Sequence, residues 1–231
     1  MEVYTMSKVN PVVLPDGNLF FNSPHGPTIE SQIKETFDQS YQHYYLKYFK
    51  LKKNMTVLDI GASNGMWALR VARRVNPGRV ITVEPLTENY ETLLNNIAIN
   101  NITNIVPLQA AVWKTNGKVN FIPGCAADVG FVAKDSSKGL PCNSITLDTL
   151  MERCEIKKAD LLKVDVEGGE CEALKGLSDI KNKVGFAVIE THNTLPNILQ
   201  YFRERKMFNI RIERIPNHDQ NQIVHVRIGG S

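Results

Sequence analysis

The fold is decided by residues 56–65, which read TVLDIGASNG. The first five are apolar or β-branched apart from Asp59, as in a buried β-strand, and Gly61 ends the run. The next segment, MWALRVARRV at residues 66–75, has the apolar spacing of a helix, and Asn76-Pro77-Gly78 stops it. A strand, a glycine-bearing turn and a helix in this order predict the first half of a βαβ unit.

The same alternation of strands and helices continues along the chain. We predict strands at residues 80–84, 105–112, 118–122, 161–166, 184–190, 208–214 and 222–227, and helices at residues 87–99, 147–154, 170–177 and 195–205. Only a loop separates the last two strands, so they should pair antiparallel. Because strands that alternate with helices form mostly parallel sheets covered on both faces, we predict an α/β fold for residues 51–231.

Residues 1–50 are predicted to form an N-terminal extension. Its first part is irregular and rich in proline and glycine, with a hairpin turn at Asp16-Gly17. A helix over about residues 28–49 follows, and its aromatic side chains fall on all sides rather than on one stripe. This cap helix either packs against the N-terminal segment, or lines an acceptor pocket or a homodimer contact.

Composition and charge exclude several classes of protein. The chain has 231 residues, 42% of them hydrophobic, and a net charge of +3 from 27 basic and 24 acidic residues. This charge is too small to indicate nucleic acid or an anionic membrane by itself. No apolar run approaches the roughly 18 residues of a membrane helix, the first residues lack a signal-peptide pattern, and the four cysteines form no C-x-x-C pair. We expect a cytoplasmic protein with reduced thiols, no zinc knuckle and no membrane contact.

Polar residues gather where the predicted strands end. They are residues 59–65, Glu84, Gln109 with Ala110, Asp165 with Glu167, and Glu190 with His192. In a mostly parallel sheet these positions share one edge, and ligands of open α/β sheets bind outside that edge. The sequence therefore predicts a ligand site there.

The turn after the first strand has three interpretations. Residues 61–65 fit G-x-S-x-G, the nucleophile elbow of α/β-hydrolases, with Ser63 as the nucleophile. No His-Gly-Gly segment precedes them to build an oxyanion hole. A purely structural turn is the second interpretation. The third, which we favour, is a loop for a nucleoside cofactor that ends in an amino-acid group, since the absence of G-x-G-x-x-G disfavours a dinucleotide.

In that third interpretation, each strand end has a part in holding the cofactor. Asp59 would orient the cofactor amine, and the amides at the helix start would receive its carboxylate. Glu84 would accept hydrogen bonds from the ribose hydroxyls, and Gln109 and Ala110 would meet the adenine edge. The predicted cofactor-binding residues are Asp59, Gly61, Ser63, Asn64, Gly65, Glu84, Gln109, Ala110 and Asp165.

These strand-end motifs resemble those of the FkbM family of S-adenosylmethionine-dependent methyltransferases. The resemblance covers residues 27–228 and is most specific at ITLDTL (residues 145–150) and LKVDVEGGE (residues 162–170). The family usually has Asn where this chain has Ser63, and a branched apolar residue where it has Asn64. The resemblance implies a seven-stranded, Rossmann-like class I methyltransferase fold, S-adenosyl-L-methionine as cofactor, and methylation of a hydroxyl on a sugar or small natural product.

Transfer of a methyl group to a hydroxyl requires a base, because the hydroxyl must lose its proton. We predict His192 as this base, since an ordinary imidazole changes charge near neutral pH. Asp165 is expected beside the cofactor amine or methyl, and Glu167 is expected to orient the acceptor. Together with Glu190 these residues also resemble an oxygen-rich metal site, but their spacing is not that of a known ligand motif, so no metal is predicted.

Three further hypotheses stay open. The acceptor is RNA or protein rather than a small molecule, and with RNA the basic residues between Arg203 and Arg214 would contact phosphates; a solvated basic face is the commoner explanation for them. The chain is a hydrolase that uses Ser63. Or it is a degenerate fold that binds a nucleoside without catalysis.

Overall fold

The computed structural model describes residues 10–23, 28–30, 32–33, 45–123, 130–132, 139–215 and 221–229. Most of the predicted cap helix, including residues 34–44, lies outside these ranges. Residues 45–46 are helical and residues 47–48 form a turn, so the helix ends before Phe49, where the sequence had predicted its end.

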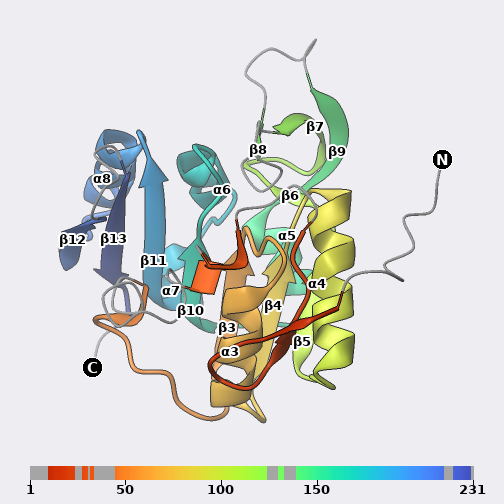
Figure 1. Cartoon of the computed structure of the whole chain (residues 1–231). Helices are drawn as coiled ribbons and strands as arrows, with labels where there is room; N and C mark the ends of the chain where they lie inside the picture. Colours follow the sequence, from red (N-terminus) through yellow and green to blue (C-terminus); the bar gives the residue numbers. More distant parts are fainter. Residues whose placement is uncertain are drawn as a thin grey trace.

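A seven-stranded sheet forms the centre of the molecule (Figure 1). Its order is β12 (Ile210–Arg214), β13 (Asn221–Arg227), β11 (Val184–His192), β10 (Ala159–Val164), β3 (Thr56–Ile60), β4 (Arg79–Val83) and β5 (Ile105–Leu108). The strands from β11 to β5 pair in parallel, whereas β13 is antiparallel to both β11 and β12. The predicted mostly parallel sheet with a C-terminal antiparallel pair is confirmed.

Helices cover both faces of this sheet. Successive residues of each strand point to opposite faces, so each strand contributes side chains to the core on both sides. Val57 packs with α3 (Met66–Val75), and Leu58 packs with α5 (Leu147–Arg153) on the other face. The remaining helices are α4 (Thr87–Ile99), α6 (Glu170–Lys175), α7 (Ile180–Lys183) and α8 (Leu195–Glu204). None of the helices in the described part of the chain is long and apolar enough to cross a membrane.

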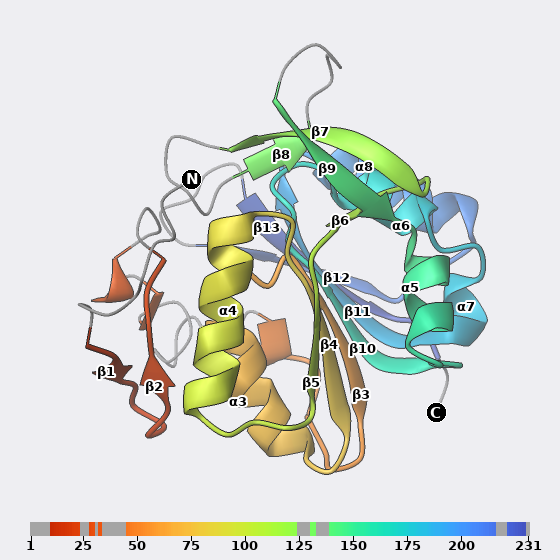
Figure 2. The same cartoon turned by 90° about the vertical axis from the view of Figure 1, so that its right-hand side faces the viewer.

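A second sheet stands at the edge where the parallel strands end (Figure 2). It has the order β6 (Ala111–Val112), β9 (Leu140–Ile145), β7 (Gly117–Pro123) and β8 (Gly130–Val132). The sequence had predicted one strand at residues 105–112 and no strand at residues 123–146. The chain instead leaves the central sheet at Gln109 and Ala110, and its next two residues pair with β9.

The N-terminal hairpin of β1 (Val12–Val13) and β2 (Leu19–Phe20) turns at Asp16-Gly17 as predicted. An asparagine of α4 and the asparagine that caps its C-terminal end hold it. The side-chain amide of Asn96 accepts from the backbone N–H of Phe21 at 2.7 Å and donates to its carbonyl at 2.9 Å. Asn100 pairs in the same way with Leu19, at 2.8 and 2.6 Å. These paired bonds dock the hairpin against α4, and Arg73 of α3 donates to Asn18 beside them.

Candidate active site

The turn after β3 is built on two glycines. Gly61 has φ +82°, and a Cβ there would lie 1.8 Å from the backbone oxygen of Asp165, so the loop rests directly on the end of β10. Gly65 has φ +89° and precedes α3, and its Cβ would lie 2.3 Å from the side chain of Leu93. A larger residue at Gly61 would push the loop away from the sheet edge, whereas one at Gly65 would have to displace the Leu93 side chain of α4.

Glu84, directly after β4, lies against this loop. It is 5% exposed, and its two carboxylate oxygens accept the backbone N–H groups of Ser63 and Leu86, each at 2.9 Å. Burial raises the pKa of Glu84 to about 7. The structure thus brings together the turn and the strand-end carboxylate that the sequence assigned to one cofactor.

One carboxylate oxygen of Asp59 pairs with a buried lysine, whereas the other, Oδ2, has no hydrogen-bond partner among the described residues. The Lys163 ammonium in β10 donates to Asp59 Oδ1 and to the carbonyl of Gly61, both at 3.1 Å, and lies 3.4 Å from Asp165 Oδ2. Burial lowers the pKa of Lys163, but the charges of Asp59 and Asp165 outweigh it and raise the pKa. Asp59 therefore supports the loop from below, through a lysine that sequence reasoning missed.

The side chains of two further predicted cofactor-binding residues form hydrogen bonds within the protein. Asn64 is 2% exposed, and its amide donates to Gln32 Oε1 at 2.9 Å, which ties the loop to the N-terminal extension. Gln109 is exposed and donates to Thr87 Oγ1 at 2.8 Å, while Ala110 is buried beside it. The side chains of Asn64 and Gln109 thus have partners within the protein, and their contact with a cofactor stays a prediction.

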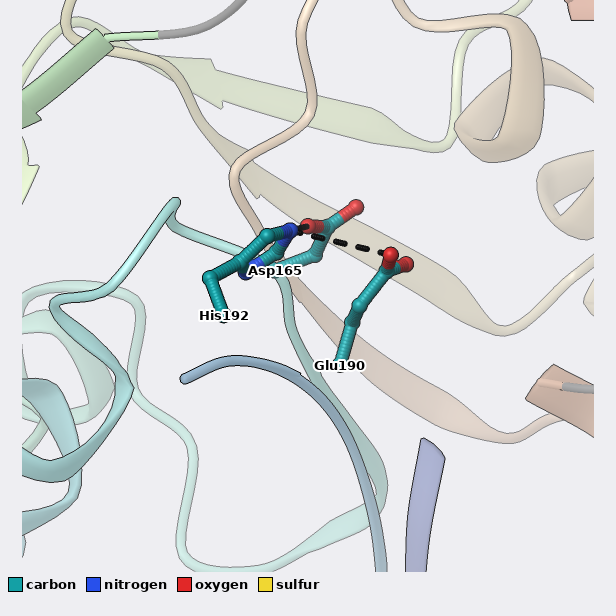
Figure 3. Close-up of side chains that lie close together, drawn as sticks. All are labelled: Asp165, Glu190 and His192. Carbon is teal, nitrogen blue, oxygen red and sulfur yellow. Dashed lines mark ion pairs between the residues drawn. The ribbon is translucent and has the colours of Figure 1, made fainter. Parts of the chain in front are cut away.

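An acidic cluster surrounds His192 at the ends of β10 and β11. The Nε2 atom of His192 lies 3.3 Å from Glu167, 3.6 Å from Glu190 and 3.9 Å from Asp165. Figure 3 shows the imidazole with Asp165 and Glu190, which extend toward it from neighbouring strands. The four residues that the sequence placed at one sheet edge thus form one group.

Glu170, the first residue of α6, completes this cluster and was missed by sequence reasoning. It is fully buried and lies 2.8 Å from His192 Nδ1, so it fixes the orientation of the ring. It also accepts from the N–H of Gly168 at 2.8 Å and from the hydroxyl of Thr194 at 2.7 Å. An acidic residue that begins a helix is ordinarily explained by the helix dipole alone, so the sequence carried no signal for this role.

The methyltransferase FkbM domain family matches residues 59–208 of the chain. The chain belongs to this family. It resembles the hexuronic acid methyltransferase AglP of Haloferax volcanii, with 29% identity over 134 residues that make up 58% of this chain and 54% of that protein. It also resembles the methyltransferase sdnD of Sordaria araneosa, with 24% identity over 162 residues, 56% of this chain and 62% of that protein. The chain therefore spans just over half the length of these relatives.

Solved structures confirm the class I methyltransferase fold of this FkbM domain. The precorrin-6y C5,15-methyltransferase of Geobacter metallireducens superposes with a TM-score of 0.56 at 9% identity, over 84% of this chain and 90% of that one. Aeropyrum pernix fibrillarin, solved with bound S-adenosyl-L-methionine, gives 0.53 at 12% identity, over 81% and 72% of the two chains. At these identities the likeness concerns the fold alone.

The charges of this FkbM domain change the expected role of His192. Burial lowers the pKa of its imidazole, but the hydrogen bond with Glu170 and the charges of Asp165 and Glu167 outweigh burial and raise the pKa to about 10. A raised pKa favours the charged ring at neutral pH, whereas the sequence argument took the pKa of an ordinary imidazole. Burial instead brings the pKa of Glu167 and Glu190 up to about 7.

The same cluster has the donor atoms of a metal site. One atom each from Asp165, Glu190 and His192 lie within 4.8 Å of one another, and a mixed set of carboxylate and imidazole suits divalent transition metals. The Lys163 ammonium, 3.4 Å from Asp165, already supplies a positive charge at this point. A cation would have to compete with it and with the proton on His192.

Proposed function

We propose that this FkbM domain binds S-adenosyl-L-methionine at the ends of β3, β4 and β5 and methylates a hydroxyl oxygen of a saccharide or small natural product. One observation carries the proposal: the loop at Gly61 touches the backbone of Asp165, so the candidate cofactor loop and the acidic cluster adjoin. The relative named as a hexuronic acid methyltransferase supports a saccharide acceptor.

In this proposal the loop and Glu84 hold the cofactor. The carboxylate of Glu84 already accepts two backbone N–H groups and a side-chain hydrogen bond from Asn89, and a ribose hydroxyl would bind at its remaining lone pair. Gly61 and Gly65 let the backbone approach closely, with Ser63 between them. Bound there, the cofactor supplies a methyl group on a positively charged sulfur: the new O–C bond forms as the S–C bond breaks, and S-adenosylhomocysteine is left.

The acidic cluster takes up the proton that the hydroxyl loses. Glu167 and Glu190 are the groups whose pKa of about 7 allows this near neutral pH. His192 stays charged and holds Glu167 at 3.3 Å, and Asp165 lies between this pair and the cofactor loop. His192, Glu167 and Asp165 thus remain the proposed catalytic residues, with the proton on a carboxylate rather than on the imidazole.

Thermal unfolding with S-adenosylhomocysteine tests the cofactor half of the proposal. At about 100 times its dissociation constant, the ligand should add about 2.7 kcal/mol to the free energy of unfolding. We expect NAD to give no shift, Glu84→Gln to weaken the shift, and Glu88→Gln, an exposed neighbour, to leave it unchanged. No shift with saturating S-adenosylhomocysteine would contradict the proposal.

The acceptor is then sought with cofactor labelled in its methyl group. Neutral methyl hexosides, hexuronates and small hydroxylated natural products are offered at equal concentration, with RNA as the comparison. Label in an O-methyl ether supports the proposal. Label in RNA that falls steeply with added salt would favour the RNA hypothesis instead.

A further inference from the structure

Tyr45 reaches the acidic cluster from outside the matched domain. It belongs to the N-terminal extension, whereas the family match begins at residue 59. Its hydroxyl lies 3.1 Å from Asp165 Oδ2 and makes a short hydrogen bond with Glu190 Oε2. A residue of the extension thus contacts two of the carboxylates at the centre of the proposed site.

The ring of Tyr45 is held from two further sides. It packs edge-on against Trp67 of α3, with 6.3 Å between the ring centroids. The Lys163 ammonium lies 5.3 Å from the centre of the Tyr45 ring and 5.6 Å from that of Trp67, within the range of a cation–π contact. The hydroxyl is therefore fixed in place by packing as well as by its hydrogen bonds.

The Tyr45 hydroxyl acts as a hydrogen-bond donor in this contact. Burial and the nearby charges of Asp165 and Glu190 raise the pKa of Tyr45 well above 10, so the phenol keeps its proton at neutral pH. A hydroxyl has one hydrogen to donate, and here it faces two carboxylates. The short bond goes to Glu190, while Asp165 has Lys163 as a second partner at 3.4 Å.

The other groups that face Glu190 do not replace this donor. Asn221 of β13 donates to it at 3.4 Å, and His192 lies 3.6 Å away. Asp165 and Glu167 add negative charge, and Lys163 adds positive charge. Among these neighbours, Tyr45 and Asn221 are the hydrogen-bond donors to Glu190, one to each carboxylate oxygen.

We propose that Tyr45 is a positioning residue of the methyl-transfer site, which holds the carboxylates of Glu190 and Asp165 in place through its hydroxyl. This inference rests on the proposed function for its catalytic meaning. It implies that the N-terminal extension completes the site rather than merely covering it. Without the hydroxyl, the negative charge of Glu190 would lose a hydrogen bond, and the carboxyl would hold its proton to higher pH.

Titration of Glu190 tests the inference without any knowledge of the acceptor. The protein is labelled with ¹³C at the glutamate carboxyl carbons, and the Glu190 signal is identified by its loss in Glu190→Gln. In the wild type we expect a midpoint of about 7. Loss of a hydrogen bond to a charged group in Tyr45→Phe should raise this midpoint by about one pH unit or more.

Tyr48→Phe is the matched control, because Tyr48 lies in the same segment and hydrogen-bonds a different glutamate, Glu213. An unchanged Glu190 midpoint in Tyr45→Phe, or an equal shift in Tyr48→Phe, would overturn the inference. If Tyr45→Phe does not fold, the same contact is tested through the pKa of Tyr45 in a Glu190 variant. Glu190→Gln should then lower the pKa of the Tyr45 phenol, followed by ¹³C-labelled tyrosine, and an unchanged pKa would overturn the inference.

Failure of the proposed function gives a different pattern. In that case the Glu190 midpoint still moves in Tyr45→Phe, but S-adenosylhomocysteine does not stabilise the wild-type protein. A stabilised wild type with an unmoved Glu190 midpoint instead leaves the proposed function standing and removes the role of Tyr45.

Discussion

Replacement of Glu170 by Gln should change the charge of His192 while leaving the architecture of the cluster intact. Gln has nearly the same shape as Glu. Its amide oxygen can still accept from His192 and from the N–H of Gly168, and its amide nitrogen can donate to the Thr194 hydroxyl, which rotates to accept. What the substitution removes is one buried negative charge, 2.8 Å from the imidazole.

The size of the effect follows from the surroundings of His192. A pKa of about 10 instead of 6.5 means that the folded protein favours the charged ring by about 5 kcal/mol. The hydrogen bond with Glu170 is the largest contribution that raises this pKa, and a hydrogen bond to a charged group contributes about 1.5–3 kcal/mol. Glu170→Gln should therefore lower the pKa of His192 by about one to two pH units.

The sign of the effect on stability follows from the same shift. Because the folded-state pKa is raised, the imidazole stabilises the fold fully below pH 6.5, and this contribution is lost as the pH rises toward about 10. Glu170→Gln should thus lower the free energy of unfolding at pH 7 by about 2 kcal/mol, and the difference from wild type should shrink as the pH rises from the lowered pKa of the variant toward about 10, above which it is gone.

Histidine labelled with ¹³C at Cε1 gives the measurement, with the His192 signal identified in His192→Gln. The control is Glu172→Gln, which removes a carboxylate of the same helix that pairs with Lys114 and Lys175 instead. A wild-type midpoint near 6.5 would refute the reasoning and return His192 to the role of a neutral base. A midpoint in Glu170→Gln within a few tenths of the wild-type value would refute the assignment of the shift to Glu170.

Two further predictions concern the loop and the cluster. Gly61→Ala should destabilise the fold by more than 2 kcal/mol in urea unfolding, because its Cβ would overlap the backbone oxygen of Asp165; Gly117→Ala, which also has positive φ but open space around it, should cost about 1 kcal/mol, and equal costs would contradict the close approach. Removal of metal ions with EDTA should leave thermal stability and the S-adenosylhomocysteine shift unchanged, since Lys163 and His192 already supply positive charge; stabilisation by Mn²⁺ in the wild type but not in Glu190→Gln would show that Asp165, Glu190 and His192 bind a cation.

The central sheet was predictable because each of its strands is marked locally. Residues 56–65 contain a strand, a turn with two obligatory glycines and a helix start, and similar patterns repeat along the chain. The break after Leu108 was not predictable in this way. Apart from Gln109, the residues from Ile105 to Val112 are all apolar, and only the pairing of the last two with β9 shows that they belong to another sheet.

The second sheet escaped prediction for a related reason. Strand β9 reads LPCNSI and is largely exposed over its first four residues, so it lacks the alternation of a half-buried strand. Its partners lie 19 to 33 residues earlier in β7 and β6, from Phe121↔Leu140 to Ala111↔Ser144. Pairing over this separation depends on tertiary structure, which a local pattern does not contain.

The residue types that gather at the candidate site were predictable from the sequence, but their protonation states were not. Strand ends place Asp165 and Glu190 at one edge of a parallel sheet whatever else surrounds them, and the sequence alone leads to this grouping. The charge state of His192 depends instead on distances of 2.8–3.9 Å to four carboxylates, one of them on a helix and invisible to the strand-end argument. An isolated imidazole would be the natural base near pH 7. In the proposed site the surrounding carboxylates raise the pKa of this imidazole, so that it keeps its proton at neutral pH. Burial raises the pKa of Glu167 and Glu190 to about 7, where a carboxylate can accept a proton. Which residue is the acid and which the base is thus a property of the packed cluster.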